Sequence, residues 1–181
     1  MTTPAQQYAA AKKRGEHPLT AQFIEQFDFG FDDFQIIACQ AVEDGKGVLV
    51  AAPTGAGKTV VGEFAAFSSL ARGKKCFYTT PIKALSNQKF AEFQERFGEN
   101  RVGLLTGDTN INSEADILVM TTEVLRNMLY ANSSTLTNLG SVVMDEVHYL
   151  ADKFRGAVWE EVLIHLMESV QVISLSATVS N

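Results

Sequence analysis

The chain has 181 residues, of which 46% are hydrophobic and 20% are charged, and this balance indicates one globular domain with a buried core rather than a disordered chain. The formal net charge of −6 excludes a basic coat over the whole surface, so a nucleic-acid ligand would have to bind at a local site. No apolar run reaches the roughly 18 residues of a membrane-spanning helix, and the first residues lack a secretory signal layout. We therefore expect no membrane partner and a cytoplasmic location, with the nucleus as the alternative in a eukaryotic cell.

The chain begins with a predicted helical extension over residues 1–28, and residues 1–20 are predicted to form a short helix outside the main core. From Phe29 onward, apolar strands alternate with amphipathic helices. One helix is expected over 58–72, and another is expected to begin at Pro81 with Thr80 as its N-cap. The predicted strands cover 47–52, 75–80, 101–105, 116–121, 141–145 and 170–175, and the last helix presents one apolar face through Val158, Val162 and Leu166.

Strands that alternate with helices predict an α/β domain over residues 29–181, in which a parallel sheet is sandwiched between helices. Ligands of such sheets bind beyond the carboxyl ends of the strands. Cys39 and Cys76 each lie in an apolar segment and lack metal-type spacing, so both are predicted to be reduced core residues.

The segment APTGAGKT, residues 52–59, lies between a predicted strand and a predicted helix and matches the phosphate-binding P-loop, except that Ala52 replaces the first glycine. Glycines at 55 and 57 would let backbone amides turn toward phosphate oxygens, and the helix would present its positive end to the same anion. Lys58 would reach the β- and γ-phosphates, and Thr59 would ligate Mg²⁺. The alternative is a glycine-containing turn that binds nothing. The predicted nucleotide-binding residues of the loop are Pro53, Thr54, Gly55, Ala56, Gly57, Lys58 and Thr59.

A second motif, DEVH, follows the apolar strand predicted to end at Asp145. Asp145 would hold Mg²⁺, and Glu146 would polarise the attacking water, so Lys58, Asp145 and Glu146 form the predicted catalytic set. Without the P-loop, two acids after a strand would indicate only a solvated acidic turn. Together with the P-loop, they indicate the second half of a nucleotide site. His148 could be a metal ligand, but it has no second histidine or cysteine at ligand spacing. The competing interpretation is a surface histidine.

Together with the P-loop, DEVH resembles the DExH-box group of superfamily 2 helicases. Further segments resemble motifs of the same group. FGFDDFQ at 29–35 resembles its adenine-reading segment, and TPIKALSNQK at 80–89 resembles motif Ia. TGD at 106–108 resembles motif Ib, TTE at 121–123 resembles motif Ic, and SAT at 176–178 resembles motif III. The segment 106–181, which includes RGAVWEE, is similar to the superkiller-type, exosome-associated RNA helicase branch. The resemblance covers about 29–181 and implies a RecA-like fold, the first domain of a helicase.

The resemblance implies roles for further residues. Gln35 would hydrogen-bond the adenine edge and Phe29 would pack on its face, and the alternative is a helix-end glutamine beside core phenylalanines. His148, Ser176 and Thr178 would couple the γ-phosphate site to a nucleic-acid track, and the alternative for the last two is a polar strand end. The nucleic-acid track would bind phosphates of the strand, and the residues that line it would be Thr80, Pro81, Lys83, Thr106, Gly107 and Thr122. The alternative is that these are ordinary loop residues and helix caps.

The family's motor contains two RecA-like domains, and the second domain, which this chain lacks, supplies arginines worth ~10³ to 10⁵ in rate. The resemblance therefore implies a fragment that binds ATP and Mg²⁺ but hydrolyses ATP poorly. In the parent protein it implies a 3′-to-5′, ATP-dependent helicase acting on single-stranded RNA, with an RNA-decay nuclease complex as a candidate partner. The alternatives are a DNA translocase or repair helicase, a P-loop small-molecule kinase and a nucleotide-gated adaptor without turnover.

Overall fold

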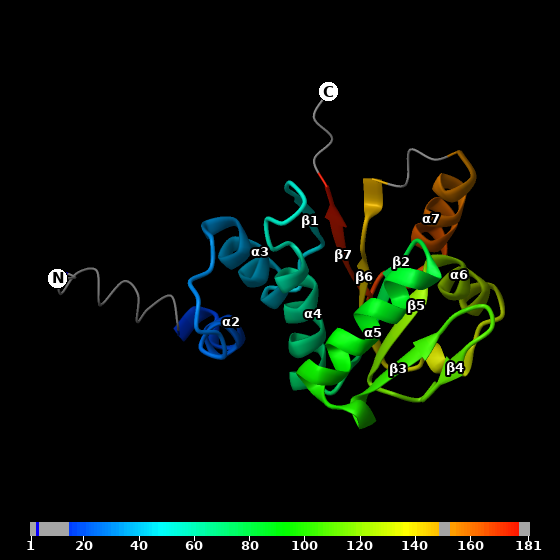
Figure 1. The fold of residues 1–181 in the computed structure, drawn as a ribbon, viewed down its shortest axis with the longest axis horizontal. Helices are drawn as coiled ribbons and strands as arrows, with labels where there is room; N and C mark the ends of the chain where they lie inside the picture. The colour runs from blue at the N-terminus through cyan, green and yellow to red at the C-terminus, as the bar shows by residue number, and fades with distance from the viewer. Residues whose placement is uncertain (1–2, 4–14, 149–152, 178–181) are drawn as a thin grey trace.

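The computed structural model describes Thr3, residues 15–148 and residues 153–177, and it shows an α/β fold with helices on both faces of one sheet (Figure 1). The helices are α2 (Pro18–Ile24), α3 (Asp33–Glu43), α4 (Thr59–Ala71), α5 (Lys83–Phe97), α6 (Thr122–Tyr130) and α7 (Lys153–His165), with short 3₁₀ turns η1 (Glu99–Arg101) and η2 (Ser134–Leu136). The strands are β1 (Val48–Ala51), β2 (Lys75–Thr80), β3 (Val102–Leu105), β4 (Asn110–Ile111), β5 (Ile117–Thr121), β6 (Leu139–Met144) and β7 (Gln171–Ser176). Within the described part of the chain, no helix is long and apolar enough to cross a bilayer.

The described strands form a single sheet in the order β1-β7-β6-β2-β5-β3-β4. Every neighbouring pair is parallel except β3 and the short β4, which run antiparallel. This confirms the predicted parallel sheet and the position of each predicted strand to within about two residues. The order is not the chain order, because the last strand, β7, lies between β1 and β6.

Two hydrophobic cores lie on opposite faces of the sheet, and the inner strands contribute to both by alternation. In β2, the side chains of Cys76 and Tyr78 belong to the core under α3, α4 and α5, whereas Phe77 belongs to the core under α6 and α7. Val162 of α7 packs in this second core and Leu166 packs against it, as predicted for that helix, and Trp159 is buried beside them. Burial on both faces explains why the strands are continuous apolar runs rather than half-polar ones.

The helix that follows β2 begins later than its sequence predicts. The expectation of a helix starting at Pro81 with Thr80 as N-cap is wrong, because α5 begins at Lys83 and Ile82 is its N-cap. Thr80 is still part of the sheet, where it pairs with Thr121 of β5. Strand pairing therefore holds the chain extended past the point at which proline alone would permit a helix to begin.

Residues 15–28 pack onto the domain instead of standing apart from it. Phe23 of α2 is fully buried, and its ring lies 5.3 Å from the ring of Phe64 in α4. Glu43 of α3 accepts hydrogen bonds from the amides of Leu19 and Thr20, at 2.9 and 2.8 Å, and so satisfies two free donors at the start of α2. The described part of the predicted extension thus shares the core, while most of the helix predicted over 1–20 lies outside the described residues.

Candidate nucleotide-binding site and nucleic-acid interface

The P-loop connects the end of β1 to the start of α4, as predicted. Gly55 and Gly57 have φ values of +83° and +78°, which L side chains rarely adopt. A Cβ atom on Gly57 would lie 2.5 Å from Nε2 of Gln35, so a side chain there would displace the Gln35 amide. Helix α4, which begins at Thr59, directs its amino end and free amides at the loop. The loop therefore has the backbone shape and the partial positive charge that an anion site needs.

Lys58 is held across the start of this loop. Its Nζ donates hydrogen bonds to the carbonyl oxygens of Ala52 at 2.7 Å and Pro53 at 2.9 Å. These contacts bring the ammonium group back over the loop instead of leaving it in open solvent. The cation, the glycine turns and the helix end therefore converge on one place, which suits a group with several negative charges such as a triphosphate.

Gln35 joins the predicted adenine-reading segment to the P-loop. Its Oε1 accepts a hydrogen bond from the Asp32 amide at 2.8 Å, and its Nε2 donates to the Gly57 carbonyl at 3.1 Å. The side chain thus has the helix-end role considered for it from sequence, and an adenine contact would use its second amide hydrogen and its second lone pair. Phe29 is 55% exposed and stacks on Phe31, with ring centroids 5.7 Å apart, so one face of its ring is open.

The DEVH acids lie just beyond β6. The Asp145 amide donates to the Thr79 carbonyl at 3.0 Å, so sheet-like pairing with β2 continues to this residue. Its carboxylate accepts a hydrogen bond from the Tyr78 hydroxyl at 2.6 Å and another from the Glu146 amide at 2.8 Å. Sequence reasoning missed Tyr78, although a buried tyrosine hydroxyl nearly always needs a polar partner, and that requirement was the available signal.

Glu146 and His148 connect these acids to the end of β7. Glu146 has a φ of +56°, an uncommon backbone state for a residue with a side chain. Nδ1 of His148 accepts a hydrogen bond from the Ala177 amide at 3.3 Å, and Nε2 lies 3.1 Å from Oε2 of Glu146. Because an amide can only donate, Nδ1 is the acceptor, and the neutral ring therefore carries its proton on Nε2, facing the carboxylate. Ser176 ends β7 beside this link, and Thr178 lies outside the described residues.

Sheet topology brings the two motifs to the same edge. Ala51 pairs with Ser176, and Met144 pairs with Ser174, so both motifs follow strands that flank β7 and run parallel to it. Neighbouring strands lie roughly 4.8 Å apart, which places the start of the P-loop about 10 Å from the DEVH acids. A triphosphate with its metal ion fits a gap of that size. No group of three or more metal-binding side chains is found among the described residues. Mg²⁺ takes one or two protein ligands and completes its shell with phosphates and water.

A groove of about 460 Å³ runs along the same edge, beyond β2 and β5. It collects residues from the segments that resemble motifs Ia, Ib and Ic, and these are Pro81, Ile82, Lys83, Thr106, Gly107, Asp108, Thr121 and Glu123. Lys83 Nζ lies 2.6 Å from Oδ2 of Asp108, and this ion pair lowers the pKa of the Asp108 carboxyl. Asp108 partly neutralises Lys83, which is the only lysine among the described residues that line the groove.

Two residues predicted for the nucleic-acid track are turned inward. Thr80 is 1% exposed and Thr122 is 3% exposed. The Thr122 hydroxyl donates to the Thr80 carbonyl at 3.2 Å, and the Thr80 hydroxyl lies 2.7 Å from the hydroxyl of Ser86. Their side chains therefore bond to neighbouring backbone and side-chain groups beside the groove. Pro81, Lys83, Thr106 and Gly107 line the groove itself, with Thr106 only 8% exposed.

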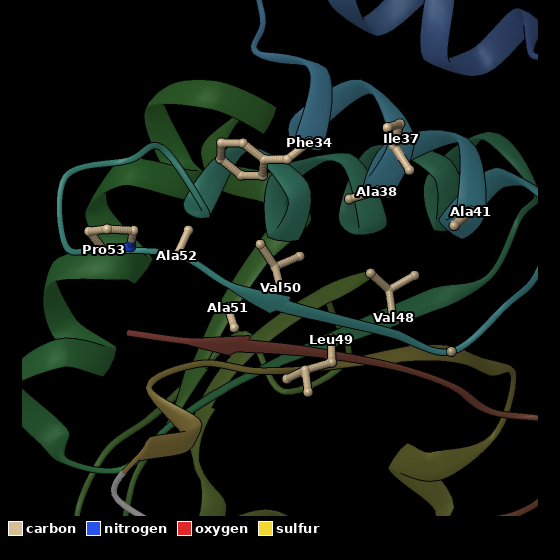
Figure 2. A pocket seen from close by; sticks show the side chains of 11 residues that line it. Phe34, Ile37, Ala38, Ala41, Val48, Leu49, Val50, Ala51, Ala52 and Pro53 are labelled. Atoms are coloured by element: carbon tan, nitrogen blue, oxygen red, sulfur yellow. The ribbon is translucent and has the colours of Figure 1, made fainter. Parts of the chain in front are cut away.

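Another hollow, of about 570 Å³, follows the free edge of β1 beneath α3 (Figure 2). Its walls are the backbone of β1 and apolar side chains such as those of Phe34, Ile37 and Val50. Neither Phe29 nor Lys58 lines it. Its described lining has no charged side chain of the kind that binds a phosphate, and it meets the P-loop only at Ala52 and Pro53.

Comparisons with known proteins agree with this geometry. Residues 32–181 match the DEAD/DEAH box helicase family. The probable helicase HelY of Mycobacterium leprae is 63% identical over 161 residues, which are 89% of this chain and 18% of that protein. Superkiller complex protein 2 of Mus musculus is 53% identical over 156 residues, which are 86% of this chain and 12% of that protein, in line with the superkiller-type resemblance.

A solved structure, the Mycobacterium smegmatis helicase Lhr bound to ssDNA and AMP-PNP, superposes with a TM-score of 0.71 at 32% identity, covering 89% of this chain and 24% of that one. This similarity supports the predicted RecA-like fold. The chain spans less than a fifth of the curated relatives it matches, at 18% and 12%. The sequence motifs, the parallel sheet and these matches lead to one conclusion: the chain belongs to the DEAD/DEAH box helicase family.

Proposed function

We propose that this chain is the ATP-binding domain of an ATP-driven, 3′-to-5′ nucleic-acid helicase that acts on single-stranded RNA. The observation that carries the proposal is the convergence of the P-loop and the DEVH acids at one edge of the sheet, on the two strands that flank β7. A kinase or an adaptor could share the P-loop. Neither would account for the groove lined by three further helicase-like segments on the same edge.

In this proposal the P-loop amides and Lys58 bind the triphosphate, and Thr59 and Asp145 hold the magnesium ion. Bound Mg²⁺ would neutralise charge on the phosphates. Glu146 orients the attacking water and accepts its proton. Its carboxylate can take this role because it lies next to Asp145 but is not needed as a ligand of the magnesium ion. Gln35 and Phe29 would bind the adenine at the other end of the loop, where Gln35 already contacts the carbonyl of Gly57.

Coupling would use the link from Glu146 through His148 to Ala177. The His148 ring contacts the Glu146 carboxylate on one side and the amide that follows Ser176 on the other. A change at the γ-phosphate that moves Glu146 would therefore also move His148 and the end of β7. The segment after β7, with Thr178, would carry it to a second RecA-like domain of the parent protein.

Single-stranded RNA would bind by its phosphates along the groove that contains Lys83, Thr106 and Gly107. RNA is favoured because the superkiller-type resemblance extends over the second half of the chain, and a role with an RNA-decay complex follows from the same resemblance. DNA is the second candidate ligand, because the structurally similar Lhr is bound to ssDNA.

Nucleotide binding and turnover test the ATP site separately. Lys58→Ala is expected to weaken binding of Mg·ATP strongly, and Glu146→Gln is expected to spare binding and abolish turnover. Lys46→Ala is the matched control for the lysine, because Lys46 precedes β1 at the opposite edge of the sheet and pairs with Asp44. Unchanged affinity in Lys58→Ala would refute the site, and unchanged turnover in Glu146→Gln would remove Glu146 from its role as base.

Stimulation of the ATPase tests the nucleic-acid ligand in the longer parent protein. We expect single-stranded RNA to raise the rate more than single-stranded DNA of the same sequence, and Lys83→Ala to raise the RNA concentration that half-saturates the effect. Stronger stimulation by DNA would replace the RNA assignment with the DNA alternative. The 181-residue chain alone is expected to bind nucleotide and to hydrolyse it poorly, because the arginines of a second domain are needed for full rate.

A further inference from the structure

A buried tyrosine lies directly behind the proposed metal ligand. Tyr78 of β2 is fully buried, and its hydroxyl donates a 2.6 Å hydrogen bond to Oδ2 of Asp145. Tyr78 pairs with Val143 of β6, so Asp145, two residues further on, projects from the same face of the sheet. This is the diagonal cross-strand position, within reach of a long aromatic side chain. A bond of this length to a carboxylate is a strong, charge-assisted one.

The tyrosine ring has little freedom to move. Phe93 of α5 packs edge-on against it with ring centroids 5.0 Å apart, and Lys89 Nζ lies 5.6 Å from the ring centre. Gly62 of α4 meets the ring from the helix that follows the P-loop: a Cβ atom there would lie 2.8 Å from Cε2 of Tyr78. The position of the hydroxyl is therefore set by two helices and two strands.

The hydroxyl can act only as a donor toward Asp145. A carboxylate has only acceptor oxygens, so the hydrogen in the bond between Tyr78 and Asp145 is the one on the phenol. One oxygen of Asp145 is then engaged by Tyr78 and the other by the amide of Glu146. Because a carboxylate offers about four lone-pair directions, these two bonds fix its rotation and leave the others for a cation and its waters.

We infer that Tyr78 is a positioning residue, which orients the Asp145 carboxylate for the magnesium ion that accompanies the nucleotide. The inference rests on the proposed function and adds a group to its metal site. Partners that orient a metal ligand typically contribute 10- to 100-fold to metal affinity. Tyr78→Phe removes only the hydroxyl and keeps the ring, so it should raise the Mg²⁺ concentration needed for nucleotide binding by roughly 10-fold or more.

The test uses the 181-residue chain and a fluorescent, non-hydrolysable ATP analogue, with Mg²⁺ titrated from zero. Binding of the analogue without Mg²⁺ should be equal in wild type and Tyr78→Phe, because the P-loop is unchanged. Tyr130→Phe is the matched control, since Tyr130 of α6 is 55% exposed and lies outside the site. Phe93→Leu loosens the packing on the Tyr78 ring and keeps the hydroxyl, and it should shift the Mg²⁺ titration much less than Tyr78→Phe.

The outcomes separate this inference from the proposed function. If the wild-type chain binds no nucleotide in Mg²⁺, the proposed function itself fails. If wild type responds to Mg²⁺ and Tyr78→Phe gives the same titration, the positioning role is overturned. Should Tyr78→Phe not fold, Gly62→Ala tests the same geometry, because its new methyl group would displace the ring. An unchanged Mg²⁺ requirement in a folded Gly62→Ala variant would also overturn the inference.

Discussion

Phe23 tests whether the segment before residue 29 belongs to the folding unit. Its side chain is fully buried, and the rings of Phe27, Phe31, Phe64 and Phe67 surround it at centroid distances of 5.0 to 6.1 Å. Replacing a fully buried phenylalanine by alanine typically lowers the free energy of unfolding by about 3–5 kcal/mol. A domain is typically stable by about 5–15 kcal/mol, so Phe23→Ala should remove a large fraction of the stability.

The assay is urea unfolding followed by tryptophan fluorescence. Trp159 is the only tryptophan in the chain and is 1% exposed in the core on the other face of the sheet, remote from Phe23. A loss of stability reported by Trp159 therefore shows that the two cores unfold together. We expect a much lower urea midpoint with an unchanged slope, and a melting temperature lower by about 10 °C.

Phe29→Ala provides the contrasting substitution in the same aromatic cluster. Phe29 is 55% exposed, so its loss should change the free energy of unfolding by less than about 1 kcal/mol while weakening nucleotide binding. If Phe23→Ala instead lowered stability by no more than Phe29→Ala, residues 15–28 would be an appendage, and the division at residue 28 would be a division between independent units.

Three other predictions concern the sheet, the cysteines and the groove. Gly103→Ala should cost roughly 2–3 kcal/mol in urea unfolding, because its Cβ would lie 2.2 Å from the Asn112 carbonyl oxygen, whereas Gly30→Ala, with nothing within 4 Å, should be neutral. Burial raises the pKa of Cys39 and Cys76 to about 12, so neither thiol should be alkylated at about pH 9 until the chain unfolds, and rapid labelling of the native chain would contradict this protection. Because the thiols of the unfolded chain ionise near pH 8.5, the free energy of unfolding should fall as the pH rises above about 8.5. Asp108→Asn should free Lys83 from its ion pair and raise the affinity for single-stranded RNA several-fold at low salt, and a lower affinity would show that Asp108 instead holds Lys83 in place.

Much of the site could be predicted because its signals are local. Gly55, Gly57 and Lys58 act through the backbone of one short loop, and a loop between a buried strand and a helix is recognisable without knowing what surrounds it. The strand KCFYTT is apolar at successive positions, which indicates burial on both faces before any partner strand is known. The family resemblance then supplied roles for residues such as Gln35 and His148, for which local patterns leave several meanings open.

The remaining features depend on which distant segments meet. Phe23 enters the core because α2 packs on α4, and Thr80 remains in a strand because β5 pairs with it. The bonds from Tyr78 to Asp145 and from Lys83 to Asp108 join segments that are 67 and 25 residues apart.

What the sequence by itself determined about this protein is therefore the set of elements and the P-loop and DEVH motifs, since backbone freedom, hydrophobic periodicity and charge are properties of short segments. Only the tertiary structure decided that β7 lies between β1 and β6 and that the two motifs consequently share one edge. It also decided that Tyr78, on a third strand, β2, hydrogen-bonds to Asp145 of the DEVH motif. Strand order is set by how both faces of the whole sheet become buried, and no single segment contains that information.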